Sequence, residues 1–351
     1  MKFKRLLVSL ISVLLLFTMC ACAKKSEETK DMTQSDSHNN GNLTVIGFSQ
    51  LGAESDWRSE NTLSMKTSLS EENGYELIFD DGQQKQSNQI TAIRKFIQQD
   101  VDYIVLAPVT ETGWNTVLEE AKDARIPVLI VDRMVDVNND DLFACFVGSD
   151  FELEAKKVTT WMNNYFNLNG IPNNDIKIVN IQGNIGASAQ IGRTKGLRDA
   201  CSKYGWTLLD EVPGEFTQAK GREVMENFLI DYPELNVVYC ENDNEALGAI
   251  EAIEAAGLSV GSDITNGQIM VVSFDGVGET AKQYAMEGKI SCIGECNPLH
   301  GPRVNVLIGM FEYGLKPEKI CFVDESIFSS YPGITALKID GKEYPVTILA
   351  E

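Results

Sequence analysis

The side chains in this sequence that could bind a ligand are charged and amide groups that follow apolar, strand-like segments. Carboxylates, carboxamides and guanidinium groups exchange hydrogen bonds with hydroxyls, and charged partners make the stronger bonds. Six strand ends carry polar groups of this kind, and their main candidates are Glu54, Ser55, Asp56, Trp57, Arg58, Asp132, Arg133, Asn242 and Asp275. Hydroxyl recognition, as in sugar binding, is the chemistry that this set favours.

The pair Trp57-Arg58 has the composition of a sugar site. An indole ring can cover the C–H face of a sugar while the guanidinium donates in a fixed fork to two hydroxyls. The structural alternative is a core tryptophan beside a solvated arginine, and spacing alone does not separate the two. Asp132, Asn242 and Asp275 have a similar alternative as helix N-caps or members of local ion pairs. The binding interpretation therefore depends on the number of such strand ends.

Short apolar segments alternate with longer amphipathic ones, which predicts strands and helices in turn. The strand-like segments are 43–49, 76–79, 103–107, 128–131, 144–147, 176–181, 237–240, 270–274 and 290–294, and the helical patterns are 90–99, 115–124, 152–166, 187–204, 220–231, 245–256 and 299–311. Apolar strands joined by helices are typical of parallel sheets covered on both faces. The pattern breaks near 148–151. We therefore predict an α/β protein of two doubly wound, Rossmann-like lobes that binds ligand beyond the strand ends.

The first 42 residues predict export. A basic start precedes an apolar run at 6–19, which is too short to span a membrane comfortably and fits a cleaved signal peptide of residues 1–21. Ala21-Cys22 at its end resembles a lipoprotein processing box, so Cys22 is the expected lipid anchor and 22–42 a polar tether. The formal charge of −21 becomes −24 once three signal cations are removed. Such acidity excludes nucleic acid as a partner.

Other motifs for chemistry are scarce. The dispersed cysteines and the two histidines, His38 and His300, give neither a zinc spacing nor a disulfide framework. The segment 276–281 imitates a dinucleotide fingerprint, but Asp275 directly before it would repel a pyrophosphate. The segment 136–141 lacks the glycine and distal glutamate of a calcium loop. We therefore expect a protein that binds without catalysis, cofactor or metal.

Several long segments, in order, resemble the type I periplasmic sugar-binding proteins of ABC importers, most closely their galactofuranose-binding branch. They are GFSQLGAESDWR (47–58), DGQQKQ (81–86), APVTETGW with VLEEAKDARIPV (107–128), VDR (131–133), IQGNIGASAQIGRTKG (181–196), GEFTQAKGREVMENF (214–228), END (241–243) and SFDG (273–276). The resemblance implies two lobes joined by three crossovers: residues 43–148 with about 298–323, and residues 149–297 with about 324–351.

The resemblance also implies which residues bind the sugar. It assigns Glu54, Trp57 and Arg58 to one loop, Asp132 with Arg133 to a strand end, and Arg193 to the matching helix of the second lobe, followed by Asn242 and Asp275. Two positions depart from the branch pattern. Gly192 stands where an aspartate often precedes the arginine, so an orienting carboxylate is missing there. Glu241, often a histidine, is expected to add negative charge near the pocket.

The expected partners are a monosaccharide, an ABC transporter permease and, through the lipid, the outer face of the cytoplasmic membrane; the chain is expected to be a monomer. A sensor subunit that reports to a kinase remains an alternative, because both kinds of partner recognise closed lobes. A glycan-processing enzyme is a second alternative and would need a carboxylate pair about 5–10 Å apart. A LacI-type repressor core is excluded by the export signal and by the acidic body.

Overall fold

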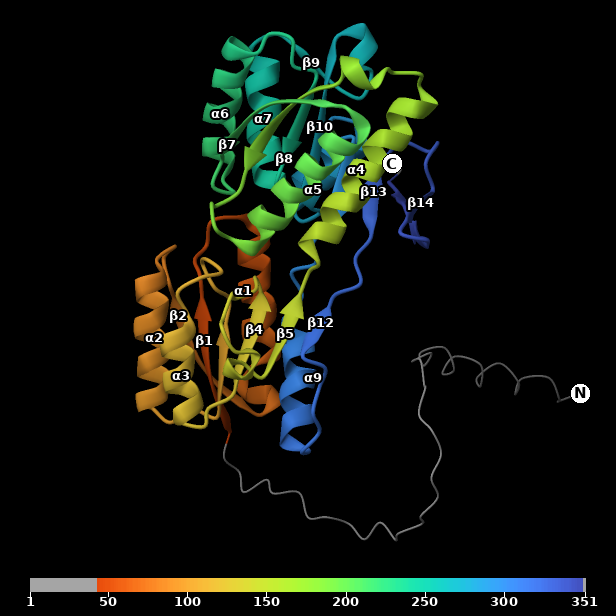
Figure 1. Cartoon of the computed structure of the whole chain (residues 1–351). Helices are drawn as coiled ribbons and strands as arrows, with labels where there is room; N and C mark the ends of the chain where they lie inside the picture. The colour runs from red at the N-terminus through yellow and green to blue at the C-terminus, as the bar shows by residue number, and fades with distance from the viewer. Residues whose placement is uncertain (1–42, 350–351) are drawn as a thin grey trace, which may run out of the picture. The chain divides into compact units, whose positions relative to one another are not determined.

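Two parallel β-sheets organise the computed structural model, which describes residues 43–349 (Figure 1). The predicted signal peptide, Cys22 and tether lie outside the described residues. Within the described part, no helix is both long and apolar enough to cross a membrane. The predicted α/β class with parallel-sheet lobes is confirmed.

The first sheet is parallel throughout, with the order β12-β5-β4-β3-β1-β2. Its strands are β1 Thr44–Gln50, β2 Tyr75–Asp81, β3 Tyr103–Leu106, β4 Val128–Asp132, β5 Cys145–Gly148 and β12 Ile320–Phe322. Its helices are α1 Asp56–Ser68 and α9 Gly301–Glu312, which pack together on one face, and α2 Gln86–Gln98 and α3 Asn115–Asp123 on the other (Figure 1). Separate apolar cores lie on the two faces, as expected for a doubly wound sheet.

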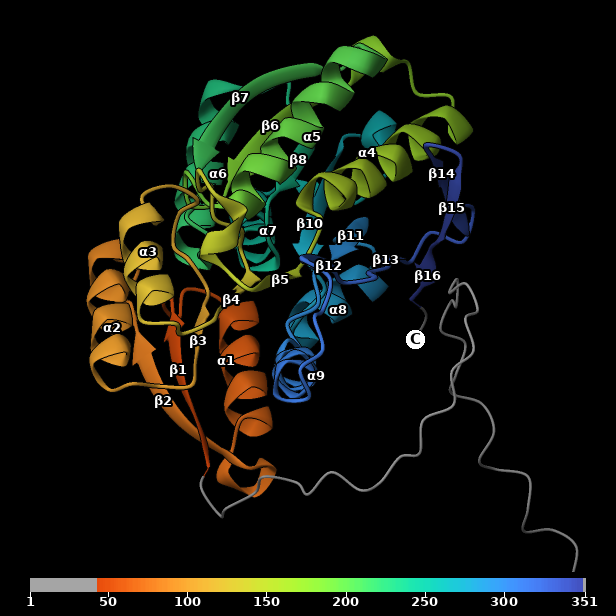
Figure 2. The same ribbon diagram turned by 60° about the horizontal axis from the view of Figure 1, so that its bottom comes forward.

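The second sheet has the order β16-β13-β11-β10-β8-β6-β7, with β9 beside β10 and only β13 antiparallel to β11 among the described pairs. Its strands are β6 Lys177–Gln182, β7 Thr207–Pro213, β8 Val237–Cys240, β9 Ser259–Val260, β10 Gln268–Asp275, β11 Cys292–Glu295, β13 Ile327–Ser329 and β16 Thr347–Ile348. Its helices are α4 Phe151–Leu168 and α5 Ser188–Tyr204 on one face, and α6 Gln218–Asp231, α7 Asp243–Ala255 and α8 Glu279–Met286 on the other (Figure 2).

The remaining elements are short. The hairpin β14 Ala336–Ile339 with β15 Lys342–Pro345 packs on α4, and single 3-10 turns lie at Glu71–Asn73, Asp140–Leu142, Asn173–Asp175 and Ile264–Asn266. Every strand and helix pattern expected from the sequence overlaps an observed element. The sequence missed β7, an edge strand with Asp210 and Glu211 in its middle, because an edge strand need not be wholly apolar.

Both lobes repeat one strand order. Sheet one contains β2-β1-β3-β4-β5 and sheet two contains β7-β6-β8-β10-β11, each with its first strand second in line. The chain passes between the lobes three times: from β5 to α4, from β11 to α9, and from β12 to β13 (Figures 1 and 2). In such sheets the crevice beyond the carboxyl strand ends is the binding place.

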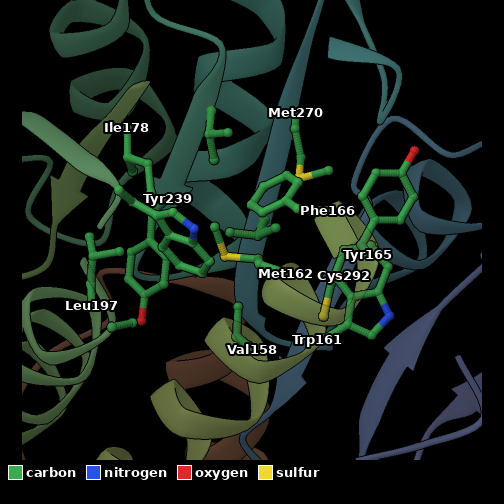
Figure 3. Close-up of a cluster of buried hydrophobic side chains, with 14 of the residues drawn as sticks. Val158, Trp161, Met162, Tyr165, Phe166, Ile178, Leu197, Tyr239, Met270 and Cys292 are labelled. Carbon is green, nitrogen blue, oxygen red and sulfur yellow. The ribbon is translucent and has the colours of Figure 1, made fainter. Parts of the chain in front are cut away.

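Figure 3 shows the apolar core that lies between the second sheet and helices α4 and α5. Helix α4 contributes Trp161, Met162 and Phe166, which pack against strand residues such as Tyr239. The Tyr239 hydroxyl donates to the backbone oxygen of Arg193, 3.1 Å away. Tyr239 is completely buried, and a hydrogen bond is stronger where water is excluded. The bond therefore helps to hold α5, which carries Arg193, against the sheet.

Candidate functional site

A cavity between the carboxyl ends of the two sheets collects most of the predicted residues. It encloses about 280 Å³ of empty space, part of it open to solvent. Its lining is Glu54, Ser55, Trp57, Arg58, Asp132, Arg133, Phe151, Ala189, Arg193, Phe216, Asn242, Asp275 and Cys296. Most of the lining side chains are charged or aromatic, and they come from both lobes, so the site suits a small polar ligand.

The first lobe supplies two arginines and two carboxylates. Arg58 donates through Nη2 to Asp132 Oδ2 at 2.7 Å and through Nε to Glu54 Oε1 at 3.2 Å. Arg133 donates to the same Glu54 oxygen at 3.3 Å. Burial alone would raise the pKa of Asp132, but the charges of Arg58 and Arg133 outweigh it and lower that pKa. The carboxylate therefore stays ionised and able to accept hydrogen bonds.

The second lobe supplies one arginine between two carboxylates. Arg193 donates through Nη2 to Asp275 Oδ1 at 3.3 Å and through Nε to Glu154 Oε2 at 3.0 Å. It also donates to the backbone oxygen of Glu241. Burial raises the pKa of Asp275 to about 6, because Arg193 offsets only part of the burial effect. The two half-sites thus differ in charge balance.

Asp132 and Asp275 share an unusual backbone. They end β4 and β10, each the fourth strand of its lobe if the short side strand β9 is left out, and their φ angles are +64° and +102°. A non-glycine residue in this region is strained, and such strain persists where the surroundings fix it, often at binding sites. It turns each carboxylate out of its sheet toward an arginine of the first helix in the same lobe, Arg58 on α1 and Arg193 on α5.

Aromatic rings cover the walls between these charges. Trp57 comes from the first lobe, and Phe151 and Phe216 come from the second. Trp57 Nε1 donates to the backbone oxygen of Cys296 at 2.7 Å, which fixes the indole plane. Arg133 stacks over the Phe216 ring at 5.2 Å, across the two lobes. Charged forks between aromatic faces are the surroundings that a ring with many hydroxyls requires.

Three predicted residues have more limited roles than expected. Asn242 lines the cavity, but its Oδ1 caps α7 by accepting from Glu245 N at 2.8 Å and its Nδ2 donates to Phe216 O at 3.1 Å. Ser55 also caps, accepting from Arg58 N at 3.2 Å, and lines the cavity. Asp56 is exposed and does not line it.

Two expectations about charge need correction. The carboxylate missing before Arg193 is replaced by Glu154 of α4, whose Oε2 lies 2.9 Å from Arg193 Nη2. A Cβ on Gly192 would lie 2.7 Å from the Cβ of Phe151, so a larger residue would push α4 away. Glu241 does not line the cavity, since its carboxyl accepts from Gly183 N and Asn180 Nδ2 inside the lobe. Burial raises its pKa to about 7, which reduces its charge.

The comparison with known families agrees with this geometry. A family model described as a periplasmic binding protein domain matches residues 46–298. The chain belongs to the periplasmic binding protein family. The predicted resemblance is thereby confirmed, and the match spans both sheets.

Individual relatives of this periplasmic binding protein are similar over most of its length. The galactofuranose-binding protein YtfQ of Escherichia coli (strain K12) is 40% identical over 289 residues, 81% of this chain and 87% of the relative. A Mycobacterium smegmatis structure in complex with β-D-fucofuranose matches with a TM-score of 0.76 and 38% identity over 82% of this chain and 91% of the other. The arabinose transporter component of Shewanella sp. ANA-3, bound to α- and β-L-arabinofuranose, matches with a TM-score of 0.74 and 39% identity over 81% and 91%. YtfQ is named as a sugar-binding protein and the Shewanella protein as the periplasmic binding component of an ABC transporter, in agreement with the expectation of binding without catalysis.

Sequence reasoning missed several residues of the site. Glu154 sits on the apolar face of α4, between Phe151 and Val158 at helical spacing, and a charge on that face is a signal that could have found it. Phe216 follows Glu215 in a turn where both φ angles are positive, near +58°, and no local sequence motif indicates its role.

The six cysteines of the described residues are all free thiols, and five of them are buried.

Proposed function

We propose that this periplasmic binding protein captures one monosaccharide in the cavity between its lobes. The observation that carries the proposal is the pair of matching half-sites, in which Arg58 faces Asp132 and Arg193 faces Asp275. Each guanidinium can donate to a hydroxyl or ring oxygen, and each carboxylate can accept from hydroxyls. The residues assigned as ligands are Glu54, Ser55, Trp57, Arg58, Asp132, Arg133, Arg193, Asn242 and Asp275.

We further propose that the sugar is bound as a furanose. The three relatives described above are named for galactofuranose, fucofuranose and arabinofuranose, which differ in substituents and share a five-membered ring. We therefore expect the site to discriminate between furanose and pyranose rings more strongly than between different exocyclic groups. Galactose is the first candidate, and fucose and arabinose are its natural competitors.

Isothermal titration with D-galactose, D-fucose, L-arabinose and D-ribose tests the sugar, and ¹³C NMR of bound [1-¹³C]galactose tests the ring form. We expect binding of at least one sugar from the first three and a bound signal at a furanose chemical shift. A pyranose signal would refute the furanose assignment alone. No binding of any sugar in the panel would refute the sugar site.

Ligands from both lobes imply that binding draws the lobes together, because only a closed cleft lets Arg58 and Arg193 reach one ring. We propose hinge closure over the division at 148/149, about 297/298 and about 323/324. Small-angle scattering with saturating sugar should show a smaller radius of gyration than without it. An unchanged radius would contradict closure.

We also propose that the protein is held outside the cytoplasm by a lipid on Cys22 and passes its sugar to an ABC permease. The support is the Ala21-Cys22 box after an apolar run and the family of the folded part. Cys22→Ser should move the protein from the membrane fraction to the soluble fraction, with Cys20→Ser as the matched control. Retention of Cys22→Ser and release of Cys20→Ser would assign the anchor to the other cysteine.

A further inference from the structure

A buried polar cluster lies behind the cavity, where the three chain crossings meet. Ser149 follows β5, Cys296 follows β11, and Glu325 lies between β12 and β13. Glu325 Oε1 accepts from Ser149 Oγ and from Asn297 N, both at 2.7 Å, so one carboxyl ties the other two crossings together. Ser149 Oγ also lies 3.3 Å from Cys296 Sγ. We call Glu154, Cys296 and Glu325 the hinge cluster.

Glu154 joins the hinge cluster to the ligand cavity. Its Oε2 accepts from Arg193, while its Oε1 accepts no hydrogen bond from any nitrogen or oxygen of the described residues, although Glu154 is only 1% exposed. Side-chain ligand atoms of Glu154, Cys296 and Glu325 all lie within 4.8 Å of one another. A buried acceptor without a strong donor is costly; the Cys296 thiol is a weak donor to Glu154, and a protonated Glu325 would be a stronger one.

The buried charges around the hinge cluster also favour a bound proton. Three buried carboxylates, those of Glu154, Asp275 and Glu325, face two cations, Arg193 and Lys157. Three negative and two positive charges leave one excess negative charge in a region that excludes water. Further out, Glu295 and Asp324 face Lys157, while Asp132, Asp243 and Arg58 face Asp275, so acidic groups outnumber the one additional cation. One bound proton balances the set.

We propose that the hinge cluster holds this proton and acts as a positioning site, keeping Glu154 aligned on Arg193 so that proton loss opens the hinge and weakens sugar binding. The inference rests on the proposed function, since Arg193 is an assigned sugar ligand. In closed lobes the cluster is dry, and in open lobes water can solvate its carboxylates. Closure therefore takes up a proton, and affinity falls with rising pH by up to about tenfold per pH unit.

The direction of the titration agrees. Burial, with a smaller contribution from Glu154, raises the pKa of Glu325 to about 9, and burial also raises the pKa of Glu154. Burial raises the pKa of the Cys296 thiol as well. Burial thus shifts each group toward its protonated form, and Glu325, with the higher pKa of the two carboxyls, is the first to hold the proton. Lys157 titrates in the opposite sense, because burial lowers its pKa, so it cannot cause a loss of affinity as pH rises.

The test compares Glu325→Gln with wild type. The glutamine can accept from Ser149 and Asn297 and donate to Glu154 Oε1, but it does not titrate. Isothermal titration with whichever of D-galactose, D-fucose or L-arabinose binds most tightly at pH 7 should give a wild-type Kd that rises at least tenfold from pH 7 to pH 9.5. Glu325→Gln should change less than threefold. Glu295→Gln, a neighbouring carboxylate outside the cluster, should follow wild type.

A sugar-free measurement separates this inference from the proposed function. A carboxyl whose pKa is raised on folding keeps a proton that the unfolded chain has released, so stability falls as pH rises toward the raised pKa. Urea unfolding should show a steeper loss between pH 7 and 9.5 for wild type than for Glu325→Gln. Absence of sugar binding at every pH would refute the sugar site and leave this readout to decide the cluster.

Three outcomes would overturn the inference. A flat wild-type Kd from pH 7 to 9.5 would mean that closure takes up no proton. A rise that persists in Glu325→Gln would assign the titration to a group other than Glu325. Stabilisation by one equivalent of Zn²⁺ in wild type but not in Cys296→Ser would make the cluster a metal site instead.

Discussion

The two half-sites of the cavity are built on the same plan and carry different charge. In each lobe an arginine of the first helix meets an aspartate that ends the fourth strand in a left-handed backbone. The first lobe adds Arg133 and Glu54, so two arginines face two carboxylates. The second adds Glu154 alone, so one arginine faces two carboxylates. Equal topology thus yields one half-site that stays ionised and one that can take up a proton.

This difference follows from where the additional charges come from. Glu54 lies just before α1, four residues from Arg58, and its pairing is local. Glu154 comes from a neighbouring helix, and it also belongs to the hinge cluster with Cys296 and Glu325. The first half-site is therefore self-contained, and the second contacts the chain crossings, where we propose the hinge.

The largest expected effect comes from Arg193→Ala. Its loss leaves Glu154 and Asp275 without their cation inside the protein, and an uncompensated buried charge costs roughly 3–5 kcal/mol. We expect more than hundredfold weaker sugar binding and a clearly lower free energy of unfolding. Calorimetric titration and urea unfolding measure both quantities.

Arg58→Ala is the matched control, because Arg133 remains 3.3 Å from Glu54 and 3.8 Å from Asp132. We expect a smaller loss of stability and a tenfold to hundredfold loss of affinity, corresponding to about 1.5–3 kcal/mol. Equal destabilisation by the two variants would show that the charge difference between half-sites has no energetic consequence.

A smaller effect is expected from acid. Asp275, with its pKa raised to about 6, should lose its charge between pH 7 and pH 5, while Asp132, with a lowered pKa, should keep it. If Asp275 accepts from sugar hydroxyls as a carboxylate, affinity should be roughly tenfold weaker at pH 5 than at pH 7. Asp275→Asn should bind weakly at both pH values, with little change between them.

The same titration has the opposite sign for stability. Because folding raises the pKa of Asp275, the folded state binds a proton more tightly, and this group stabilises it increasingly as pH falls through 6. As pH falls from 7 to 5, affinity should therefore decrease while the contribution of Asp275 to folding stability increases. Asp132→Asn should weaken binding but should still lose affinity between pH 7 and pH 5. An acid loss of the same size in Asp275→Asn would assign the titration elsewhere.

The sequence predicted most of the fold and much of the cavity lining for one physical reason. Parallel strands are apolar and end at one edge, so the polar residues directly after them, such as Asp132 and Asp275, must gather there. Glu154 was missed because it lies within a helix and not at a strand end. It reaches the site because of the helix face on which it lies. The hinge cluster was missed because Glu154, Cys296 and Glu325 meet only through the three-dimensional path of the chain.

Sequence alone also could not separate a capping residue from a ligand, and Asn242 is the case in point. It caps α7 in a reciprocal arrangement with Glu245, whose carboxylate accepts from Asn242 N at 3.1 Å. Its side-chain oxygen is therefore used, and only one amide hydrogen is left for a sugar. Its counterpart Ser55 caps the helix that carries Arg58 itself.

The smallest expected change in affinity therefore comes from Asn242→Ala. Loss of an N-cap costs about 1 kcal/mol of stability, typically 0.5–2. Phe216 N still donates to Glu245 Oε1 at 2.8 Å, so the aromatic wall stays in place and Kd should change less than about fivefold. Ser55→Ala should cost similar stability but weaken binding more, because it loosens the first turn beneath Arg58. Urea unfolding and calorimetric titration of both variants test the contrast, and a tenfold or greater loss of affinity with unchanged stability in Asn242→Ala would show that Asn242 acts chiefly as a sugar ligand and only secondarily as a cap.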